Sequence, residues 1–143
     1  MRTLFYLGVF LLLSSLPVSG QIVDEVPREV ARSWVALVDE GKYEESWKTA
    51  SPLFQQAVSR EDWVAKIRKL RKTWGKLKKR EFVRGRYVES PVNFPQGDYF
   101  ALEYRTEFEN VKISELVVPV KDETGLWQVG SYSISTKTPQ QVQ

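Results

Sequence analysis

Residues 99–108 read YFALEYRTEF, and this stretch decides the fold. Its even-numbered positions, from Phe100 to Phe108, hold apolar side chains or Thr106, while the positions between them are mostly charged or small. Side chains of a strand alternate between two faces, so a period of two predicts a half-buried strand with a core face and a polar outer face. Such an outer face suits the pairing of two copies of the chain, and it is equally typical of any solvated sheet. The outer face comprises Tyr99, Ala101, Glu103, Arg105 and Glu107.

The same period continues on both sides of this strand. Residues 76–90 alternate after Gly75 and are followed by a turn rich in Pro, Asn and Gly at residues 91–97. Beyond a turn at Asn110, two more strands are expected over residues 111–121 and 126–135, joined by a hairpin turn at residues 122–125.

The strand expected over residues 111–121 has an irregular pattern. Ile113 and Leu116 are apolar but three residues apart, so the apolar face changes parity between them. A change of parity within one strand predicts a β-bulge, which we place near Ser114-Glu115. In the last strand, Gly130 permits a bend.

Before residue 75 the hydrophobic period is that of a helix. Trp63, Ile67, Leu70 and Trp74 lie at i, i+4, i+7 and i+11, the spacing of one helical stripe. Ser59-Arg60-Glu61-Asp62 has the spacing of a capping box, with Asp in place of Glu, and Gly75 ends the pattern. The sequence therefore predicts a helix from residue 59 to 75 with its apolar stripe on the core.

Shorter helical signals lie nearer the N-terminus. Val30, Trp34, Leu37 and Val38 form another stripe, which begins after Asp24 and Pro27 and ends at Gly41. A short helix is expected over residues 42–50, and Ser51-Pro52 has the form of a cap and first residue for one more turn through Val58. Helices followed by four meandering strands predict an α+β fold, in which N-terminal helices pack into a curved, cone-like, four-stranded antiparallel sheet.

The first twenty residues have the three parts of a secretory signal. Met1-Arg2 is a positive start, residues 4–13 are apolar, and Val18-Ser19-Gly20 is a small-residue cleavage site. The apolar run would span about 15 Å as a helix, half of a bilayer core of about 30 Å. We therefore predict a signal peptide at residues 1–20, one domain at residues 21–135 and a flexible polar tail at residues 136–143. The protein is expected to be exported, periplasmic or extracellular.

The composition excludes several kinds of chemistry. The chain has no Cys and no His, so a Cys–His or Ser–His–Asp nucleophile system cannot be built. The usual ligands of zinc, copper, haem and iron–sulfur clusters are missing as well. Calcium loops with alternating Asp residues are absent. We expect no cofactor, no metal and no enzymatic activity.

Three blocks of the chain resemble a known family. Residues 34–47 read WVALVDEGKYEESW, residues 54–59 read FQQAVS before Trp63, and residues 125–132 read GLWQVGSY. This pattern resembles the uncharacterised exported bacterial family DUF4019 over about residues 26–135, and its last block is similar to strands of nuclear transport factor 2-like domains. The resemblance implies a cone-like α+β fold, nuclear transport factor 2-like or cystatin-like, and no assigned activity. Enzymes of the wider superfamily often use a His or Asp within the cone, and this chain has no His.

The charge is concentrated in one segment. Residues 66–86 contain eleven Lys or Arg and one acid, Glu81, whereas the segments on both sides are acidic. This distribution indicates either an electropositive face for an anionic partner or a solvated helix face that acids from elsewhere in the fold, such as Glu103, Glu107 and Glu109, partly neutralise. The candidate binding residues are Lys66, Arg68, Lys69, Arg71, Lys72, Lys76, Lys78, Lys79, Arg80, Arg84 and Arg86.

The sequence leaves several functions open. The leading hypothesis is a non-enzymatic binding module whose partner is an envelope protein, an anionic envelope polymer or lipid, or a second copy. Nucleic acid is disfavoured because the aromatic residues lie on the buried stripes. A small-ligand carrier with an aromatic-lined cone is the alternative. An enzyme that uses Asp, Glu or Tyr ranks last, because adjacent acids on a helix diverge by about 100° and cannot form a carboxylate pair across a cleft.

Overall fold

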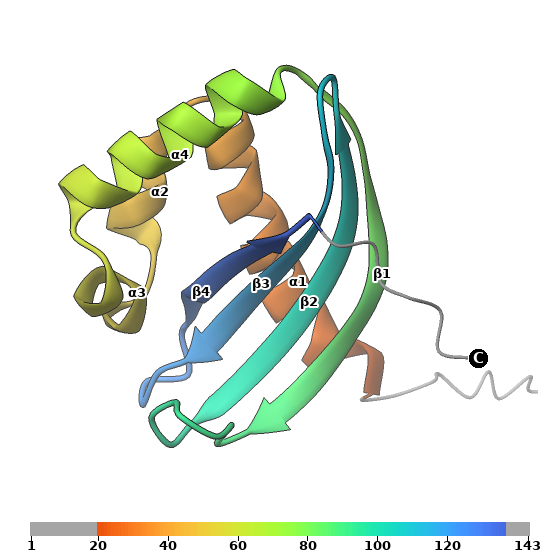
Figure 1. The fold of residues 1–143 in the computed structure, drawn as a ribbon. Coiled ribbons are helices and arrows are strands. Elements are labelled where there is room, and N and C mark those ends of the chain that lie inside the picture. Colours follow the sequence, from red (N-terminus) through yellow and green to blue (C-terminus); the bar gives the residue numbers. More distant parts are fainter. Residues whose placement is uncertain (1–19, 137–143) are drawn as a thin grey trace, which may run out of the picture.

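The computed structural model describes residues 20–136, with side chains from Asp24 onward. Helices α1 to α4 come first in the chain and strands β1 to β4 follow (Figure 1). The predicted α+β class is therefore confirmed. The elements are α1 Gly20–Asp39, α2 Tyr43–Thr49, α3 Pro52–Ala57, α4 Arg60–Trp74, β1 Leu77–Glu89, β2 Asp98–Phe108, β3 Lys112–Lys121 and β4 Trp127–Ser135.

The strands form one antiparallel meander in the order β1-β2-β3-β4. Tyr87 pairs with Phe100, and Leu102 pairs with Val117, so the apolar positions of β2 lie on the same face as those of its neighbours. That face is the core face, because Phe100, Leu102 and Phe108 are all buried. The alternation of residues 99–108 thus predicted the orientation of the whole sheet.

The bulge predicted near Ser114-Glu115 is wrong. β3 pairs with β2 without a register shift from Leu102↔Val117 to Glu107↔Lys112. Ile113, Glu115 and Val117 all face the core, and Glu115 is fully buried. The parity does not change, because a charged residue occupies an inward position. The irregularities of the sheet lie in β1 and between β3 and β4 at Val118/Pro119.

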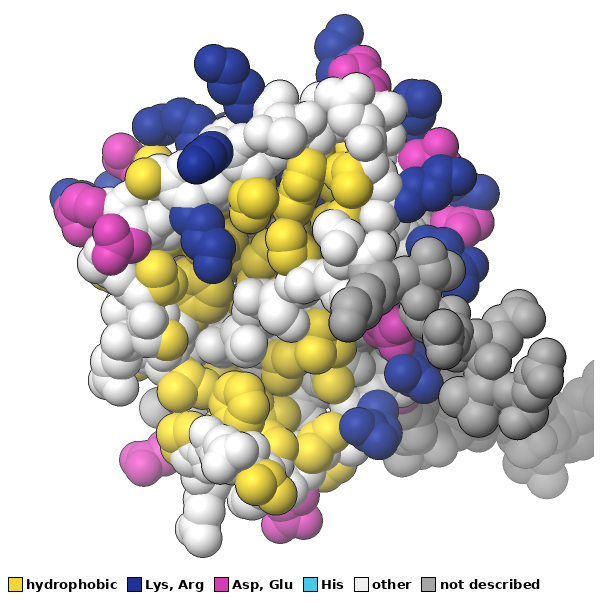
Figure 2. Space-filling view, in the orientation of Figure 1, with side chains coloured by type: hydrophobic (Ala, Val, Ile, Leu, Met, Phe, Trp, Pro, Cys, Tyr) yellow, Lys and Arg dark blue, Asp and Glu magenta, His cyan; other side chains and the backbone are white. Residues whose placement is uncertain are grey.

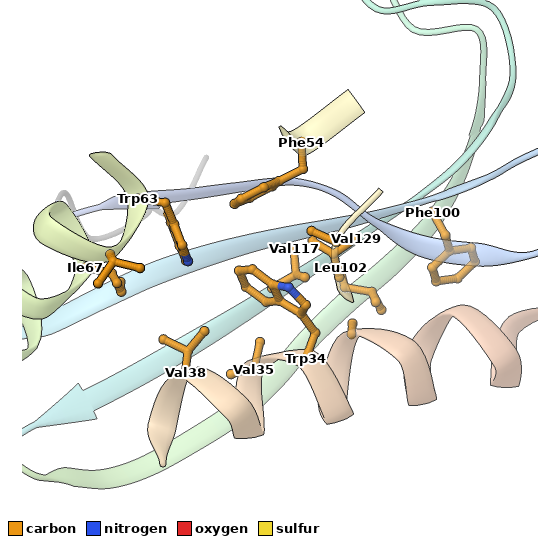
Figure 3. Packing of buried hydrophobic residues seen from close by; sticks show 13 residues of the cluster. Trp34, Val35, Val38, Phe54, Trp63, Ile67, Phe100, Leu102, Val117 and Val129 are labelled. Atoms are coloured by element: carbon orange, nitrogen blue, oxygen red, sulfur yellow. The ribbon is translucent and has the colours of Figure 1, made fainter. Parts of the chain in front are cut away.

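The core lies between the sheet and the helices. α1 contributes Trp34, Val35 and Val38, and α4 contributes Trp63 and Ile67 (Figure 3). They meet residues of α3 and of three strands, namely Phe54, Phe100, Leu102, Val117 and Val129 (Figure 3). The predicted inward stripe of α4 is confirmed, and that of α1 is confirmed for Val30, Trp34 and Val38. Leu37 is only half-buried, and Val35 is buried in the core instead.

Ser46 holds two tryptophans of this core in place. Its carbonyl oxygen accepts the indole N–H of Trp34 at 2.7 Å, and its hydroxyl accepts that of Trp63 at 3.0 Å. Ser46 is fully buried. Both buried indole N–H groups thus have the partner that they need, and the rings of Trp34, Phe54, Trp63 and Tyr132 pack on one another in this part of the core.

The first helix begins earlier than predicted. α1 starts at Gly20 and includes Pro27, whereas the sequence placed the start near Asp24 and Pro27. Residues 1–19 of the predicted signal peptide and residues 137–143 of the predicted tail lie outside the described residues. Between residues 20 and 136, no helix is long and apolar enough to cross a membrane.

Candidate basic face and internal ion-pair network

Helix α4 presents basic side chains because its other side is buried. Ser59 caps its first turn by accepting the backbone N–H of Asp62 at 3.1 Å. Trp63, Ile67 and Trp74 are buried on the core side. With about 100° between successive residues, the remaining circumference is occupied in order by Arg68, Lys72, Lys69 and Lys66, all of them exposed.

The four exposed residues of α4 and Lys76 beyond it form what we call the α4 basic face. Ion pairs in the part of the chain that the structure describes involve none of these five side chains. Figure 2 shows Lys and Arg side chains along the top of the molecule, over α4. The α4 basic face consists of Lys66, Arg68, Lys69, Lys72 and Lys76.

One flank of the α4 basic face borders a shallow hollow of about 540 Å³. Arg68, Lys72 and Lys76 line it, and the guanidinium of Arg68 lies 6.0 Å from the ring of Tyr43. Glu109 also lines the hollow. Three exposed cations around one hollow provide a surface that can accept an anionic group.

Three acids, Glu103, Glu107 and Glu109, were expected to balance part of the positive charge of α4. For Glu103 and Glu107 this expectation is wrong. Glu103 pairs with Arg84 at 2.7 Å, and Glu107 lies 3.7 Å from Lys112. Both acids are thus engaged by cations of the sheet itself. Glu109 is the named acid that lies beside α4, in the hollow.

Two predicted face residues, Arg71 and Arg80, lie inside the molecule instead. Their side chains are 9% and 16% exposed, and both bind Asp39 at the end of α1, each at 2.6 Å. The guanidinium of Arg71 lies 4.7 Å from the ring of Phe108. Counting them as surface cations was wrong, because a run of charges does not reveal which members point inward.

Arg80 continues the chain of charges to a buried acid. Its Nε donates to Glu115 at 2.8 Å. Thr106 also donates to Glu115, and the hydroxyl of Tyr132 donates at 2.6 Å. A buried carboxylate is tolerated only when it is paired and hydrogen-bonded, and Glu115 has three such partners. We call Arg71, Asp39, Arg80 and Glu115 with these two hydroxyls the internal network.

The internal network changes the ionisation of its members. Burial opposes the charge on Arg80, but hydrogen bonds and attraction from Asp39 and Glu115 outweigh it and raise the pKa of the guanidinium. Burial and the adjacent charge of Glu115 raise the pKa of the Tyr132 phenol well above its usual value. Arg80 is therefore charged and Tyr132 neutral at any physiological pH.

The other predicted site residues lie on the outer sheet face or near it. Lys79 pairs with Glu81 at 2.6 Å and Arg84 with Glu103, so both charges are balanced locally. Lys78 and Arg86 are exposed. The eleven predicted residues thus do not form one surface: five make the α4 basic face, two belong to the internal network and four lie on β1.

One residue of the predicted outer face is covered. Tyr99 is 1% exposed, because Phe94 of the β1–β2 loop packs on its ring at 5.7 Å and Pro95 accepts its hydroxyl at 2.7 Å. A hollow of about 490 Å³ on this side is lined by Ala101 and Glu103 among others. Pairing of two copies through this face stays a prediction.

Sequence reasoning missed the internal network because its members are far apart in the chain. Asp39 at the end of a predicted helix carries no local signal of burial, and Glu115 was expected only as part of a β-bulge. One signal was present: an acid between the apolar residues Ile113 and Val117, at the position an alternating strand buries. Within residues 24–136, no group of three or more Asp or Glu is arranged to hold a metal ion.

Comparison with known proteins defines the relationships of the chain. A solved structure of a protein from Catenulispora acidiphila is similar at 14% identity and a TM-score of 0.56, covering 80% of this chain and 91% of that one. This likeness concerns the fold alone. Among curated proteins, none matches the chain. A family model described as "Protein of unknown function (DUF4019)" matches residues 30–132, and the chain therefore belongs to the DUF4019 family.

Proposed function

We propose that the protein is an exported, non-enzymatic binding module that uses the α4 basic face to dock on an anionic component of the cell envelope. The observation that carries this proposal is the absence of ion pairs at all five cations of that face within residues 24–136, whereas Lys79, Arg84 and Lys112 of the sheet are each paired with an acid. The signal-like residues 1–20 motivate export.

The arrangement of the cations favours a broad anionic surface as the partner. Arg68, Lys72, Lys69 and Lys66 follow one another around the exposed side of α4, and the hollow beside them is shallow. Each Lys or Arg held near an anionic membrane contributes about 1 kcal/mol of attraction. Several such contributions give useful binding to a lipid or polymer surface that presents many charges.

The environment of the buried acid Glu115 supports a role without catalysis. Glu115 is fully buried and accepts hydrogen bonds from three side chains. A general acid or base must reach the proton that it transfers, and Glu115 has no exposed oxygen. The carboxylate that the fold encloses is thus occupied in holding the internal network together.

A sedimentation assay with vesicles tests this proposal. Purified protein is mixed with vesicles of phosphatidylcholine alone or with phosphatidylglycerol added, at low and at high salt. We expect binding to the anionic vesicles at low salt and release at high salt, because screening shortens the range of surface charges. Heparin, added as a soluble polyanion, shows whether a polymer competes for the same face.

Two triple variants, matched in charge, test whether the α4 basic face is the surface that binds. The triple variant Lys66→Glu, Lys69→Glu and Lys72→Glu is expected to abolish sedimentation and heparin competition. The control reverses the same number of charges on other elements: Lys42→Glu, Lys48→Glu and Lys112→Glu. Equal loss in both variants would mean that only net charge matters, and retention by the first variant would contradict the proposal.

A further inference from the structure

A cleft of about 390 Å³ opens between α1 and the edge strand β1. It lies on the core face of the sheet but away from the aromatic cluster around Ser46. Arg28 and Val35 of α1 form one wall, while Arg80, Phe82 and Tyr104 of the sheet form the other. Its volume is in the range of small-molecule sites.

The cleft exposes an aromatic surface that the core does not use. Phe82 faces inward from β1, opposite Tyr104, yet remains 45% exposed. The two rings meet edge to face at 6.0 Å. An inward apolar side chain left this exposed is available to contact a ligand, and a flat ring would extend the aromatic contact.

Two polar groups of the cleft lack the partner that such a group usually has: a carboxylate for the cation Arg28, and a hydrogen bond for the hydroxyl of Tyr104. The guanidinium of Arg28 lies 4.5 Å from the ring of Phe82, and none of the ion pairs of residues 24–136 includes it. The hydroxyl of Tyr104 has no hydrogen bond to the described part of the chain. Arg80, by contrast, is balanced by Asp39 and Glu115. One cation without a carboxylate partner and one hydroxyl without a hydrogen bond are therefore available to a ligand.

The acids of the cleft limit the charge of that ligand. Glu29 is bound by Arg32 and Ser33. Glu25, exposed at the start of the cleft wall, would repel a second negative charge. From the aromatic surface, the guanidinium of Arg28, which has no carboxylate partner, and the acid Glu25, we propose that the cleft is a binding site for a small aromatic molecule with a single negative charge, separate from the α4 basic face.

Two fluorescent probes with the same rings test this site. One is 8-anilinonaphthalene-1-sulfonate, an aromatic monoanion, and the other is N-phenyl-1-naphthylamine, which lacks the sulfonate. We expect saturable binding of the anionic probe, about tenfold tighter than that of the neutral probe because of Arg28. Arg28→Gln should remove this preference and leave the neutral probe unaffected.

Further variants locate the rings of the probe. Phe82→Ala should weaken both probes about tenfold, and Tyr104→Phe should weaken the anionic probe about threefold. Val83→Ala is the control, because Val83 is an exposed neighbour on β1 that does not line the cleft. The triple Glu variant of the α4 basic face should bind both probes like the unmodified protein.

Three results would overturn the proposal. The first is the absence of saturable binding of either probe. The second is binding that Phe82→Ala and Arg28→Gln leave unchanged. The third is binding of the anionic probe that the triple Glu variant of the α4 basic face abolishes, which would assign the sulfonate to that face.

Discussion

Arg80 on β1 donates its Nε–H to Glu115 on β3 at 2.8 Å, across the intervening strand β2. Thr106 of β2 and Tyr132 of β4 donate to the same carboxylate. Every strand of the sheet thus has a side chain at Glu115. Through Arg80 and Asp39 the internal network also reaches α1, and through Arg71 it reaches α4.

Removing the charge of Glu115 should destabilise the fold strongly. Glu115→Gln leaves Arg80 without one of its two carboxylates inside the protein, and breaking a buried pair costs about 3 kcal/mol or more. Urea denaturation followed by tryptophan fluorescence measures the loss. Glu103→Gln is the control, because its partner Arg84 is 78% exposed, and it should cost about 1 kcal/mol or less. Equal effects would contradict the structural role of the internal network.

Loss of one hydroxyl in the aromatic core should also be measurable. Ser46→Ala removes the acceptor of the Trp63 indole N–H while keeping the carbonyl that serves Trp34. An unsatisfied buried donor costs about 1–3 kcal/mol, and thermal unfolding should report it. Ser33→Ala, on the exposed side of α1, should change stability by less than about 0.5 kcal/mol. A stable Ser46→Ala variant would mean that water or a shifted Trp63 replaces the bond.

Gly85 should tolerate a methyl group worse than Gly41 does. A Cβ on Gly85 would lie 2.8 Å from Phe100 Cε1 and 3.1 Å from Leu102 Cδ2, both in the core. Overpacking of this kind costs about 1–3 kcal/mol. Gly41 has open space around it and a φ of +76°, so its replacement by Ala costs only backbone strain, about 1 kcal/mol. Denaturation of both variants gives the comparison, and the reverse order would contradict the tight packing beneath β1.

The hydroxyl of Tyr87 should lose its proton at a higher pH than an ordinary tyrosine does. Its hydrogen bond to Asp98, with burial and that negative charge, raises its pKa to about 12 from 10.0. Because the pKa is raised in the folded state, this contact stabilises the fold fully below pH 10 and is lost as the pH rises from 10 towards 12. Ultraviolet absorbance of the phenolate measures the titration. Asp98→Asn should lower the pKa of Tyr87, and an unchanged titration would exclude this contact.

The regular parts of the fold could be predicted because they depend on local patterns. The stripe from Trp63 to Trp74 and the alternation of residues 99–108 each identify a buried face without knowledge of the rest. The cap at Ser59 and the stop at Gly75 are equally local. These signals fixed the class, the order of elements and most strand boundaries.

The candidate sites were only partly predictable because they depend on long-range contacts. The basic segment was evident, but Arg71 and Arg80 find Asp39 at separations of 32 and 41 residues. No local pattern separates these two arginines from their exposed neighbours. The cleft beside Phe82 was missed for the same reason, since it depends on how far α1 covers the edge of the sheet.

We infer that Glu115 favours one of two alternative registers of β3. Judged by hydrophobicity alone, Leu116, Val118 and Val120 would suit the interior as well as Ile113 and Val117 do. A shift of one residue would exchange these two sets. It would also carry Glu115 to the outside and leave Arg80 without that carboxylate. The buried carboxylate therefore favours a single register of β3. A protein with an apolar side chain at this position could be as stable and still fold into a mixture of the two registers.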